Sequence, residues 1–341
     1  MAPGRWRLHE KTGGGDDLAS RRGKSRNAHA GRSASGHMGL DDGCQRTSPA
    51  RGGVMGLDPF SILRALCLVA VAMYMLGTAY MYVSQRSYQY FPGHQGLAAS
   101  AVGLSGVQDL KLASSDGETL QAWYAPAAVS RPTILFLHGN GGEIADRGER
   151  FAAYQAQGFG VFFLSYRGYG ASSGSPSEGG LVRDAFTAYD WLVGHGVRPE
   201  QIMVVGESLG GGVAVQLAAQ RPVAALALEA TFASAVNVAS LVYWWLPVRL
   251  LMKDQFDSLS FVGKIHAPLL ITHGEADEII PLIEGQKLFA HANEPKQMIV
   301  VPDGTHGSIF SAETWINEMK FFDQHVVPHT LSSRRKPGPP E

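Results

Sequence analysis

One short segment constrains the fold of this chain more than any other, the sequence Gly-Glu-Ser-Leu-Gly at residues 206–210. An apolar run typical of a buried strand precedes it, and a run with helical spacing follows it as far as residue 220. Gly-x-Ser-x-Gly between a strand and a helix is typical of a nucleophile elbow, a strained turn that exposes a serine hydroxyl above a parallel sheet. Glycine is needed at 206 and 210 because a side chain there would collide with the neighbouring strand or helix. The segment therefore predicts an α/β fold with Ser208 as its nucleophile.

After residue 100 the chain alternates short apolar runs with runs of helical spacing. The expected strands are 107–112, 120–124, 133–138, 161–166, 202–206, 224–229, 269–274 and 297–301. The expected helices are 143–157, 180–193, 209–220, 283–290 and 314–325. Such alternation predicts a mostly parallel sheet covered by helices on both faces, and the first two strands, with no helix between them, should form an antiparallel edge. We therefore expect one α/β domain over residues 100–328.

A serine hydroxyl is a weak nucleophile at neutral pH, so the elbow implies a histidine base and an acid that orients it. In a fold of this kind the three follow one another along the chain as serine, acid and histidine. Asp277 comes shortly after the strand expected at 269–274, and His306 lies between glycines after the last strand. We expect both in a triad with Ser208. Other candidates for the acid are Glu275, Glu278 and Asp303, whereas His273 is expected to be buried at a strand end.

The chemistry also needs two backbone N–H groups that stabilise an oxyanion. The strand expected at 133–137 ends in His138-Gly-Asn-Gly-Gly, whose glycines allow the loop to turn N–H groups toward Ser208. Asn140 and Leu209 are the expected donors, and His138 is expected to hold the loop through a hydrogen bond rather than act as a base. A phosphate-binding loop is poorly supported because no Lys-Ser or Lys-Thr pair follows the glycines.

About 39 residues separate the strands expected at 224–229 and 269–274, which is far more than a usual connection. Residues 231–265 are therefore predicted to form a small cap over the site. Tyr243, Trp244 and Trp245 in this cap would suit an acyl or other apolar group of a substrate. Packing of the same side chains on the domain core is an equally open interpretation.

Residues 65–83 form a run of 19 without any charged residue, and as a helix they would extend roughly 28 Å, close to the hydrocarbon thickness of a membrane. Arg64 and Arg86 flank the run. Four tyrosines lie around its end, as in the aromatic belt of a membrane interface: Tyr80, Tyr82, Tyr88 and Tyr90. The segment 60–86 is therefore predicted to be a single transmembrane anchor. The alternative is a signal peptide, with Gly77 and Ala79 as the small residues before its cleavage point.

Residues 1–54 are rich in Gly, Ser and Arg and are predicted to be a disordered arm, as are residues 329–341 at the other end. Residues 1–55 contain ten Lys and Arg against five Asp and Glu, so the charge bias predicts a cytoplasmic amino terminus and a domain outside the cytoplasm. The arm is interpreted either as a basic tail at anionic lipid headgroups or as translated sequence upstream of a start at Met38 or Met55.

Composition excludes several classes of function. The formal charge of the whole chain is −1, so the total shows no strong electrostatic bias toward nucleic acid, and no nucleic-acid partner is expected. Both cysteines, Cys44 and Cys67, lie in the first 70 residues, so the domain has no disulfide and no thiolate metal site. We expect neither a metal nor an organic cofactor.

Three stretches carry a resemblance to a known family: His-Gly-Asn-Gly-Gly at 138–142, Tyr-Arg-Gly-Tyr-Gly-Ala-Ser-Ser-Gly at 166–174, and Gly-Glu-Ser-Leu-Gly-Gly at 206–211. On these stretches, residues 107–326 resemble the α/β-hydrolases, and in particular the bud-emergence-type branch. The resemblance implies one amino-terminal membrane anchor, one hydrolase domain and a triad at Ser208, Asp277 and His306. Glu207 differs from the basic or neutral residue often found at its position.

The residues and the resemblance together predict a membrane-anchored serine hydrolase that cleaves a carboxylic ester, a thioester or a lipid acyl bond through an acyl-enzyme. Its expected partners are a small or lipid-like acyl substrate and the membrane. A serine peptidase or aminopeptidase of the same fold is the first alternative, in which Glu207 or Glu229 would hold the substrate ammonium group. A membrane-bound binding module without catalytic activity is the second.

Overall fold

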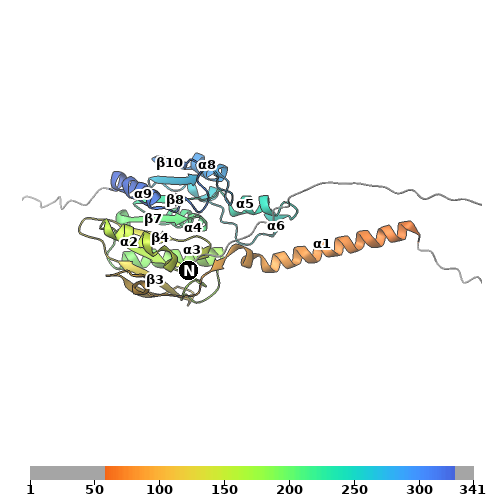
Figure 1. Ribbon diagram of the computed structural model, residues 1–341, viewed down its shortest axis with the longest axis horizontal. Helices are drawn as coiled ribbons and strands as arrows, with labels where there is room; N and C mark the ends of the chain where they lie inside the picture. Colours follow the sequence, from red (N-terminus) through yellow and green to blue (C-terminus); the bar gives the residue numbers. More distant parts are fainter. Residues whose placement is uncertain (1–57, 327–341) are drawn as a thin grey trace, which may run out of the picture. The chain divides into compact units, whose positions relative to one another are not determined.

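A mixed sheet of eight strands forms the centre of the protein in the computed structural model, which describes residues 58–326 (Figure 1). The strands lie in the order β10-β9-β8-β7-β4-β6-β3-β2. Their bounds are β2 Gln108–Ala113, β3 Thr119–Ala125, β4 Thr133–Leu137, β6 Gly160–Leu164, β7 Ile202–Glu207, β8 Ala225–Glu229, β9 Leu269–Gly274 and β10 Lys296–Val301. Strand β3 pairs antiparallel with β2 and β6, and the other neighbours pair in parallel. The predicted α/β class and the antiparallel edge are confirmed.

Helices cover both faces of this sheet, because adjacent residues of each buried strand point to opposite faces. Along β4, Leu135 and Leu137 belong to one hydrophobic cluster, and Ile134 and Phe136 belong to the other. The first cluster includes residues of α3 (Glu178–Gly194), α4 (Leu209–Ala218) and α8 (Leu282–His291). The second includes residues of α2 (Gly148–Ala156) and α9 (Ala312–His325). Both faces of the strands are therefore apolar, as the sequence pattern predicts.

Shorter elements complete the domain. The helix expected at 143–157 is divided into a 3-10 turn and α2, since the backbone of Arg147 between them departs from helical geometry. The 3-10 turns are η1 Ala99–Val102, η2 Ile144–Arg147 and η3 Pro199–Gln201. Two further strands of two residues each, β1 (Phe91–Pro92) and β5 (Gly141–Gly142), pair in parallel as a separate small sheet. This small pair links the chain just after the first helix to the loop that follows β4.

The long connection between β8 and β9 contains three short helices, where the sequence predicts a cap. They are α5 Ala235–Val242, α6 Val248–Leu251 and α7 Leu259–Val262. Ser234 caps the first of them, because its hydroxyl accepts the backbone N–H of Val236 at 3.2 Å. Figure 1 shows α5 and α6 on the side of the domain from which the first helix extends.

The first described helix, α1 (Pro59–Gln89), is 31 residues long and has a mean hydropathy of 2.0 over its most apolar window. None of its residues is buried. It is long and apolar enough to cross a membrane, and it contains the uncharged run 65–83. The predicted arm at 1–54 and the predicted tail at 329–341 lie outside the described residues.

Candidate active site

The nucleophile elbow lies between β7 and α4, at the carboxyl end of the sheet. Ser208 has φ 51° and ψ −114°, a backbone conformation that residues other than glycine rarely adopt. A Cβ atom at Gly210 would lie 2.0 Å from the carbonyl oxygen of Leu137, and one at Gly206 would lie 2.7 Å from the carbonyl oxygen of Gly210. The two glycines are therefore required by close backbone contacts, as the sequence predicts. The Ser208 N–H donates to the Glu229 carbonyl at 2.8 Å and so ties the turn to β8.

The structure brings the three residues of the predicted triad together from different strand ends. His306 Nε2 lies 3.1 Å from Ser208 Oγ, and His306 Nδ1 lies 2.8 Å from Asp277 Oδ2. Asp277 follows β9 and His306 follows β10, which are neighbours in the sheet. The separations are within hydrogen-bond range, so the arrangement has the geometry of a serine nucleophile, its base and the acid that orients the base.

Several hydrogen bonds hold Asp277 in place as an anion. Its Oδ1 accepts the backbone N–H groups of Ile279 at 2.9 Å and Ile280 at 2.8 Å. Burial opposes ionisation, but the hydrogen bonds from His273, His306 and the Ile280 N–H outweigh it and lower the pKa of Asp277. The carboxylate is therefore charged and oriented before any substrate binds.

The other candidate acids do not occupy this position. The side chains of Glu275, Glu278 and Asp303 are exposed. Glu278 accepts the backbone N–H of His306 at 3.5 Å and is not bonded to its ring nitrogens, whose partners are Ser208 and Asp277. His273 is fully buried at the end of β9, as expected, and its Nε2 lies 2.8 Å from the Ile280 carbonyl oxygen and 3.4 Å from Asp277 Oδ2. His273 thus supports the loop that carries the acid.

The loop after β4 lies beside the elbow because β4 and β7 are neighbours, with Leu137 paired to Gly206. Asn140 and Leu209, the expected oxyanion donors, both line the cavity that contains Ser208. The carbonyl of Asn140 accepts the Phe91 N–H and the Tyr169 hydroxyl, each at 2.9 Å. These bonds orient the peptide group between Asn140 and Gly141 and hold the loop in place beside the elbow.

His138, at the start of this loop, has a structural position. Its ring is fully buried between Tyr166 and Tyr169, with ring centroids 4.5 and 4.9 Å away. Its Nδ1 donates to the Gly139 carbonyl at 2.8 Å. Burial, helped by the positive charge of Arg147, lowers the pKa of His138 to about 3, so the ring stays neutral.

Buried ion pairs lie beneath the elbow. Arg147 donates to Glu207 Oε1 at 2.6 Å, and Arg150 contacts Glu229 at 2.6 Å and Glu318 at 2.9 Å. Burial favours the neutral form of Glu207, but Arg147 outweighs it and lowers the pKa of Glu207. Removing one partner of such a buried pair costs about 3–5 kcal/mol, because the other charge is then left uncompensated.

These pairs bear on the aminopeptidase alternative, which assigned the substrate ammonium group to Glu207 or Glu229. Both carboxylates are already paired with arginines, and neither lines the cavity that contains Ser208. They are therefore placed to support the elbow and the end of β8 rather than to bind a cationic substrate.

A cavity of about 500 Å³ lies above the elbow and is lined mainly by apolar side chains. Ser208 and His306 form part of its wall, together with cap residues that include Tyr243. The expectation that Trp244 and Trp245 also line the substrate cavity is not met. Trp244 is 80% exposed and Trp245 is 44% exposed, since three consecutive residues after the end of α5 cannot all point to the same side.

The end of α1 supplies cavity residues that the sequence did not predict for the substrate site, and two of them, Tyr82 and Tyr88, were expected at a membrane interface. They are Met81, Tyr82, Gln85, Tyr88 and Gln89, and Phe91 follows them. The cluster of tyrosines around the end of the uncharged run was the signal that the sequence offered. Nothing in the local sequence pattern distinguishes a tyrosine at a lipid interface from one at a cavity rim.

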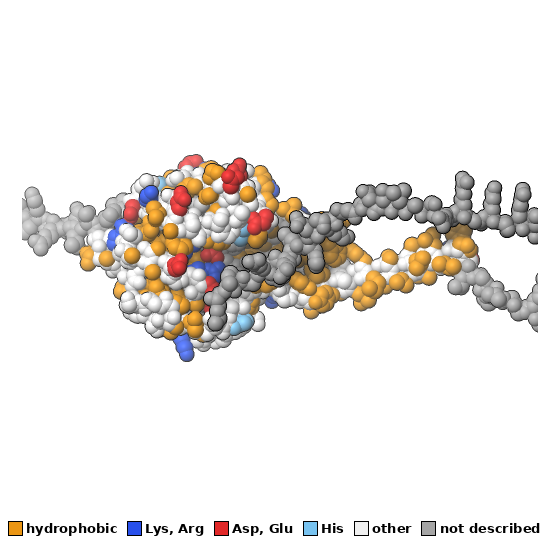
Figure 2. Space-filling model, viewed as in Figure 1, with side chains coloured by type: hydrophobic (Ala, Val, Ile, Leu, Met, Phe, Trp, Pro, Cys, Tyr) orange, Lys and Arg blue, Asp and Glu red, His pale blue; other side chains and the backbone are white. Residues whose placement is uncertain are grey.

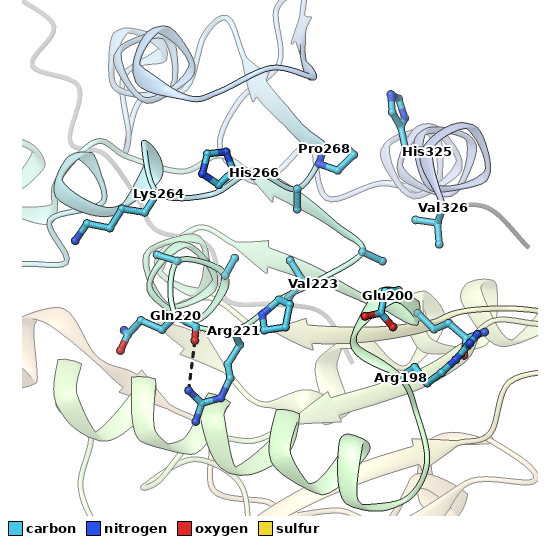
Figure 3. A pocket seen from close by; sticks show the side chains of 16 residues that line it. Arg198, Glu200, Gln220, Arg221, Val223, Lys264, His266, Pro268, His325 and Val326 are labelled. Atoms are coloured by element: carbon cyan, nitrogen blue, oxygen red, sulfur yellow. Dashed lines mark hydrogen bonds between the residues drawn. The ribbon is translucent and has the colours of Figure 1, made fainter. Parts of the chain in front are cut away.

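A second hollow, of about 800 Å³, lies at the opposite end of the strands, around the residues that precede β7, β8 and β9 (Figure 3). Arg198, Arg221, Lys264, His266 and His325 are among the side chains that line it. Ligands of parallel α/β sheets bind at the carboxyl ends of the strands, whereas this hollow is at their amino ends. It contains no member of the Ser208, His306 and Asp277 group. Within residues 58–326, no group of three or more His, Cys, Asp or Glu side chains is arranged to hold a metal ion.

Comparison with known proteins agrees with this architecture. Residues 132–259 match the family model described as the alpha/beta hydrolase fold. An uncharacterised protein of Mycobacterium tuberculosis is 39% identical over 248 residues, which cover 71% of this chain and 88% of that protein. The protein Bem46 of Schizosaccharomyces pombe is 31% identical over 253 residues, covering 70% of this chain and 85% of that protein.

Solved structures share the fold. An esterase of Pyrococcus furiosus superposes with a TM-score of 0.58 at 17% identity, covering 70% of this chain and all of that chain. An α/β-hydrolase of Vibrio vulnificus superposes with a TM-score of 0.54 at 25% identity, covering 64% of this chain and 81% of that chain. The fold supports a hydrolase. The chain belongs to the α/β-hydrolase family, in the bud-emergence-type branch that includes Bem46.

Proposed function

We propose that this protein is a membrane-anchored serine hydrolase that cleaves carboxylic ester, thioester or lipid acyl bonds. The observation that carries the proposal is the hydrogen-bonded series from Ser208 through His306 to Asp277 at the wall of an apolar cavity. An apolar cavity with a few convergent polar groups suits an acyl chain whose reactive carbonyl lies at the nucleophile.

In the proposed reaction, Ser208 Oγ attacks the carbonyl carbon of the substrate while His306 Nε2 accepts the hydroxyl proton. The carbonyl oxygen becomes an oxyanion and is stabilised by the backbone N–H groups of Asn140 and Leu209. Asp277 accepts the Nδ1–H of His306 and stabilises the imidazolium that forms. Removing one oxyanion donor typically costs about 3–4 kcal/mol of transition-state stabilisation, so the position of the loop is a major part of the mechanism.

The intermediate then collapses, and the bond from the acyl carbon to the leaving oxygen or sulfur breaks. The leaving group takes the proton from His306, and the acyl group remains bonded to Ser208 Oγ. A water molecule, deprotonated by His306, attacks this acyl-enzyme. The bond from the acyl carbon to Ser208 Oγ then breaks, Oγ takes the proton back from His306, and the carboxylic acid is released. One substrate and one water thus yield one acid and one alcohol or thiol.

The test of this proposal is reactivity toward a fluorophosphonate probe, followed by turnover of p-nitrophenyl esters and aminoacyl anilides. We expect labelling of the full-length protein and ester turnover that exceeds anilide turnover by at least about 100-fold, because the paired Glu207 and Glu229 leave no anchor for an ammonium group. Faster anilide turnover would favour the peptidase alternative. Absence of labelling and of turnover would favour the binding module.

The membrane anchor is a separate part of the proposal and has its own test. We expect the full-length protein to sediment with membranes and to resist carbonate extraction, because α1 exposes an uncharged run of 19 residues. The excess of positive charge before the run opposes translocation of the amino terminus, so protease added to spheroplasts of a bacterial host should digest the hydrolase domain. Recovery of a shortened, soluble protein that begins near Tyr80 would show instead that the segment is a cleaved signal peptide.

A further inference from the structure

The active-site cavity has one wall made by the end of the apolar helix. Met81, Tyr82 and Gln85 of α1 line the same cavity as Ser208 and His306. The helix is therefore part of the substrate site as well as a segment long enough to cross a membrane. A substrate could therefore enter the cavity either from the membrane or from water.

The cap is attached to α1 over several turns of the helix. At the end of α1, Arg86 forms an ion pair with the buried Asp254 at 2.7 Å. The preceding residue, Gln85, accepts the backbone N–H of Lys253 at 2.7 Å through its side-chain oxygen. Further back, the Tyr74 hydroxyl donates to the Trp245 carbonyl at 3.2 Å. The contacts from Tyr74 to Arg86 extend roughly 18 Å along the helix axis, so the cap lies alongside α1.

These contacts place the cap at the level of a membrane if α1 spans one. Tyr74 lies nine residues before Val83, the end of the uncharged run, which corresponds to roughly 13 Å of helix. The hydrocarbon core of a membrane is about 30 Å thick. Tyr74 would therefore lie near its middle, or in the leaflet on the side of the hydrolase domain. Trp245, in contact with Tyr74, would have to lie in the same leaflet.

The cap has the surface that such a position requires. Five exposed apolar side chains form what we call the cap ridge: Leu241, Val242, Trp244, Trp245 and Leu250, which are 62, 61, 80, 44 and 85% exposed. Residues 230–253 contain no Asp or Glu, and the exposed basic residues Arg249 and Lys253 follow the two tryptophans. Lys253, whose backbone N–H is bound to Gln85 at the end of α1, would lie at the level of the lipid headgroups, where basic side chains are typical, and the ridge would extend from there among the acyl chains. Figure 2 shows hydrophobic side chains along α1, with which the ridge is continuous through Tyr74 and Trp245.

The cavity and the ridge meet. Val242 belongs to the ridge and also lines the cavity, and Tyr82, another lining residue, is 44% exposed on the neighbouring surface of α1. The cavity rim is therefore shared by the ridge and by α1. An acyl chain could pass between them into the cavity without leaving an apolar environment.

We propose that the cap ridge inserts into the membrane leaflet beside α1, and that the cavity receives its acyl chain laterally from that leaflet. The substrate class is then a membrane-resident acyl lipid rather than a water-soluble ester. This inference rests on the proposed serine hydrolase and its anchor, and adds to them the phase from which the substrate enters. The partner of the ridge is the bilayer itself.

The position of the ridge is tested on the full-length protein in vesicles of phosphatidylcholine and phosphatidylglycerol. The fluorescence difference between the wild type and Trp244→Phe isolates the emission of Trp244. We expect brominated phosphatidylcholine to quench this emission and acrylamide in the water to leave it unchanged. Quenching by acrylamide alone would overturn the inference, because Trp244 would then face water. A dimer that covers Trp244 and exposes it only on dissociation would also overturn it, because the partner of the ridge would then be a second copy of the chain.

The route of the substrate is tested with Leu241→Asp/Leu250→Asp, which places two charges on exposed ridge positions that do not line the cavity. We expect hydrolysis of a long-chain acyl lipid in the vesicles to fall by at least about tenfold, since a carboxylate is costly to place in hydrocarbon. Turnover of soluble p-nitrophenyl butyrate should change by less than about twofold, as for a surface substitution. Val129→Asp is the matched control, because Val129 is 91% exposed and precedes β4 at the opposite end of the sheet.

The outcomes separate this inference from the proposed function. If the wild type hydrolyses both substrates and the double variant does so at the same rates, lateral entry is wrong while the hydrolase stands. If the wild type hydrolyses neither substrate, the proposed function fails, and the quenching of Trp244 still decides whether the ridge inserts.

Discussion

Replacing Ser208 by alanine is expected to abolish labelling by a fluorophosphonate and to lower ester turnover by about 10⁶-fold, leaving only a residual rate over water. The reason is that Oγ is the atom that forms the acyl bond, and it is the hydroxyl that lies 3.1 Å from His306 Nε2. The fold should be kept, because alanine removes one oxygen and the backbone at φ 51° is equally strained for serine and alanine. Turnover is measured with p-nitrophenyl esters, and folding by thermal unfolding.

A matched control for this variant is Ser105→Ala, at an exposed serine remote from the cavity. It should label and turn over like the wild type. Full labelling of Ser208→Ala would mean that a different residue is the nucleophile, and the proposed mechanism would then be wrong.

Replacing Asp277 by asparagine is expected to lower turnover by up to about 10⁴-fold. The Oδ1 atom of Asp277 accepts two backbone N–H groups, from Ile279 and Ile280, so the single oxygen of an asparagine amide would stay with them. The amide NH₂ group would then face His306 Nδ1 and donate to it. His306 would carry its proton on Nε2, toward Ser208, where it could not accept the hydroxyl proton.

The controls for this prediction are Glu275→Gln and Glu278→Gln, which remove neighbouring carboxylates that are exposed and do not contact the His306 ring. Both should retain turnover within about twofold of the wild type. If Glu278→Gln is the damaging change and Asp277→Asn is mild, the assignment of the acid is wrong. Measurement of kcat against pH for each variant distinguishes loss of the base from loss of stability.

Local pattern was sufficient to predict the sheet, the elbow and the chain positions of the candidate triad. The strand and helix runs follow from periodicity, which depends on neighbours within a few residues. The glycines at 206 and 210 mark the elbow because only a residue without a side chain tolerates the contacts of that turn. Asp277 and His306 could be selected because each follows a predicted strand near a glycine. The usual order in this fold does not separate Asp277 from Glu275 and Glu278, which follow the same strand, and Asp277 was selected as the acid with the short side chain.

Tertiary structure alone decided which side chains meet across the fold. The sequence left Glu207 free to bind a substrate ammonium, whereas the structure pairs it with Arg147, 60 residues earlier. It also grouped Tyr243, Trp244 and Trp245 as cavity residues, although only Tyr243 lines the cavity. The attachment of the cap to α1 through Arg86 and Asp254, 168 residues apart, has no signature in either segment. Periodicity shows which face of an element is apolar. The partner of that face is set by the packing of the whole chain. In this protein that packing makes the end of α1 a wall of the active-site cavity.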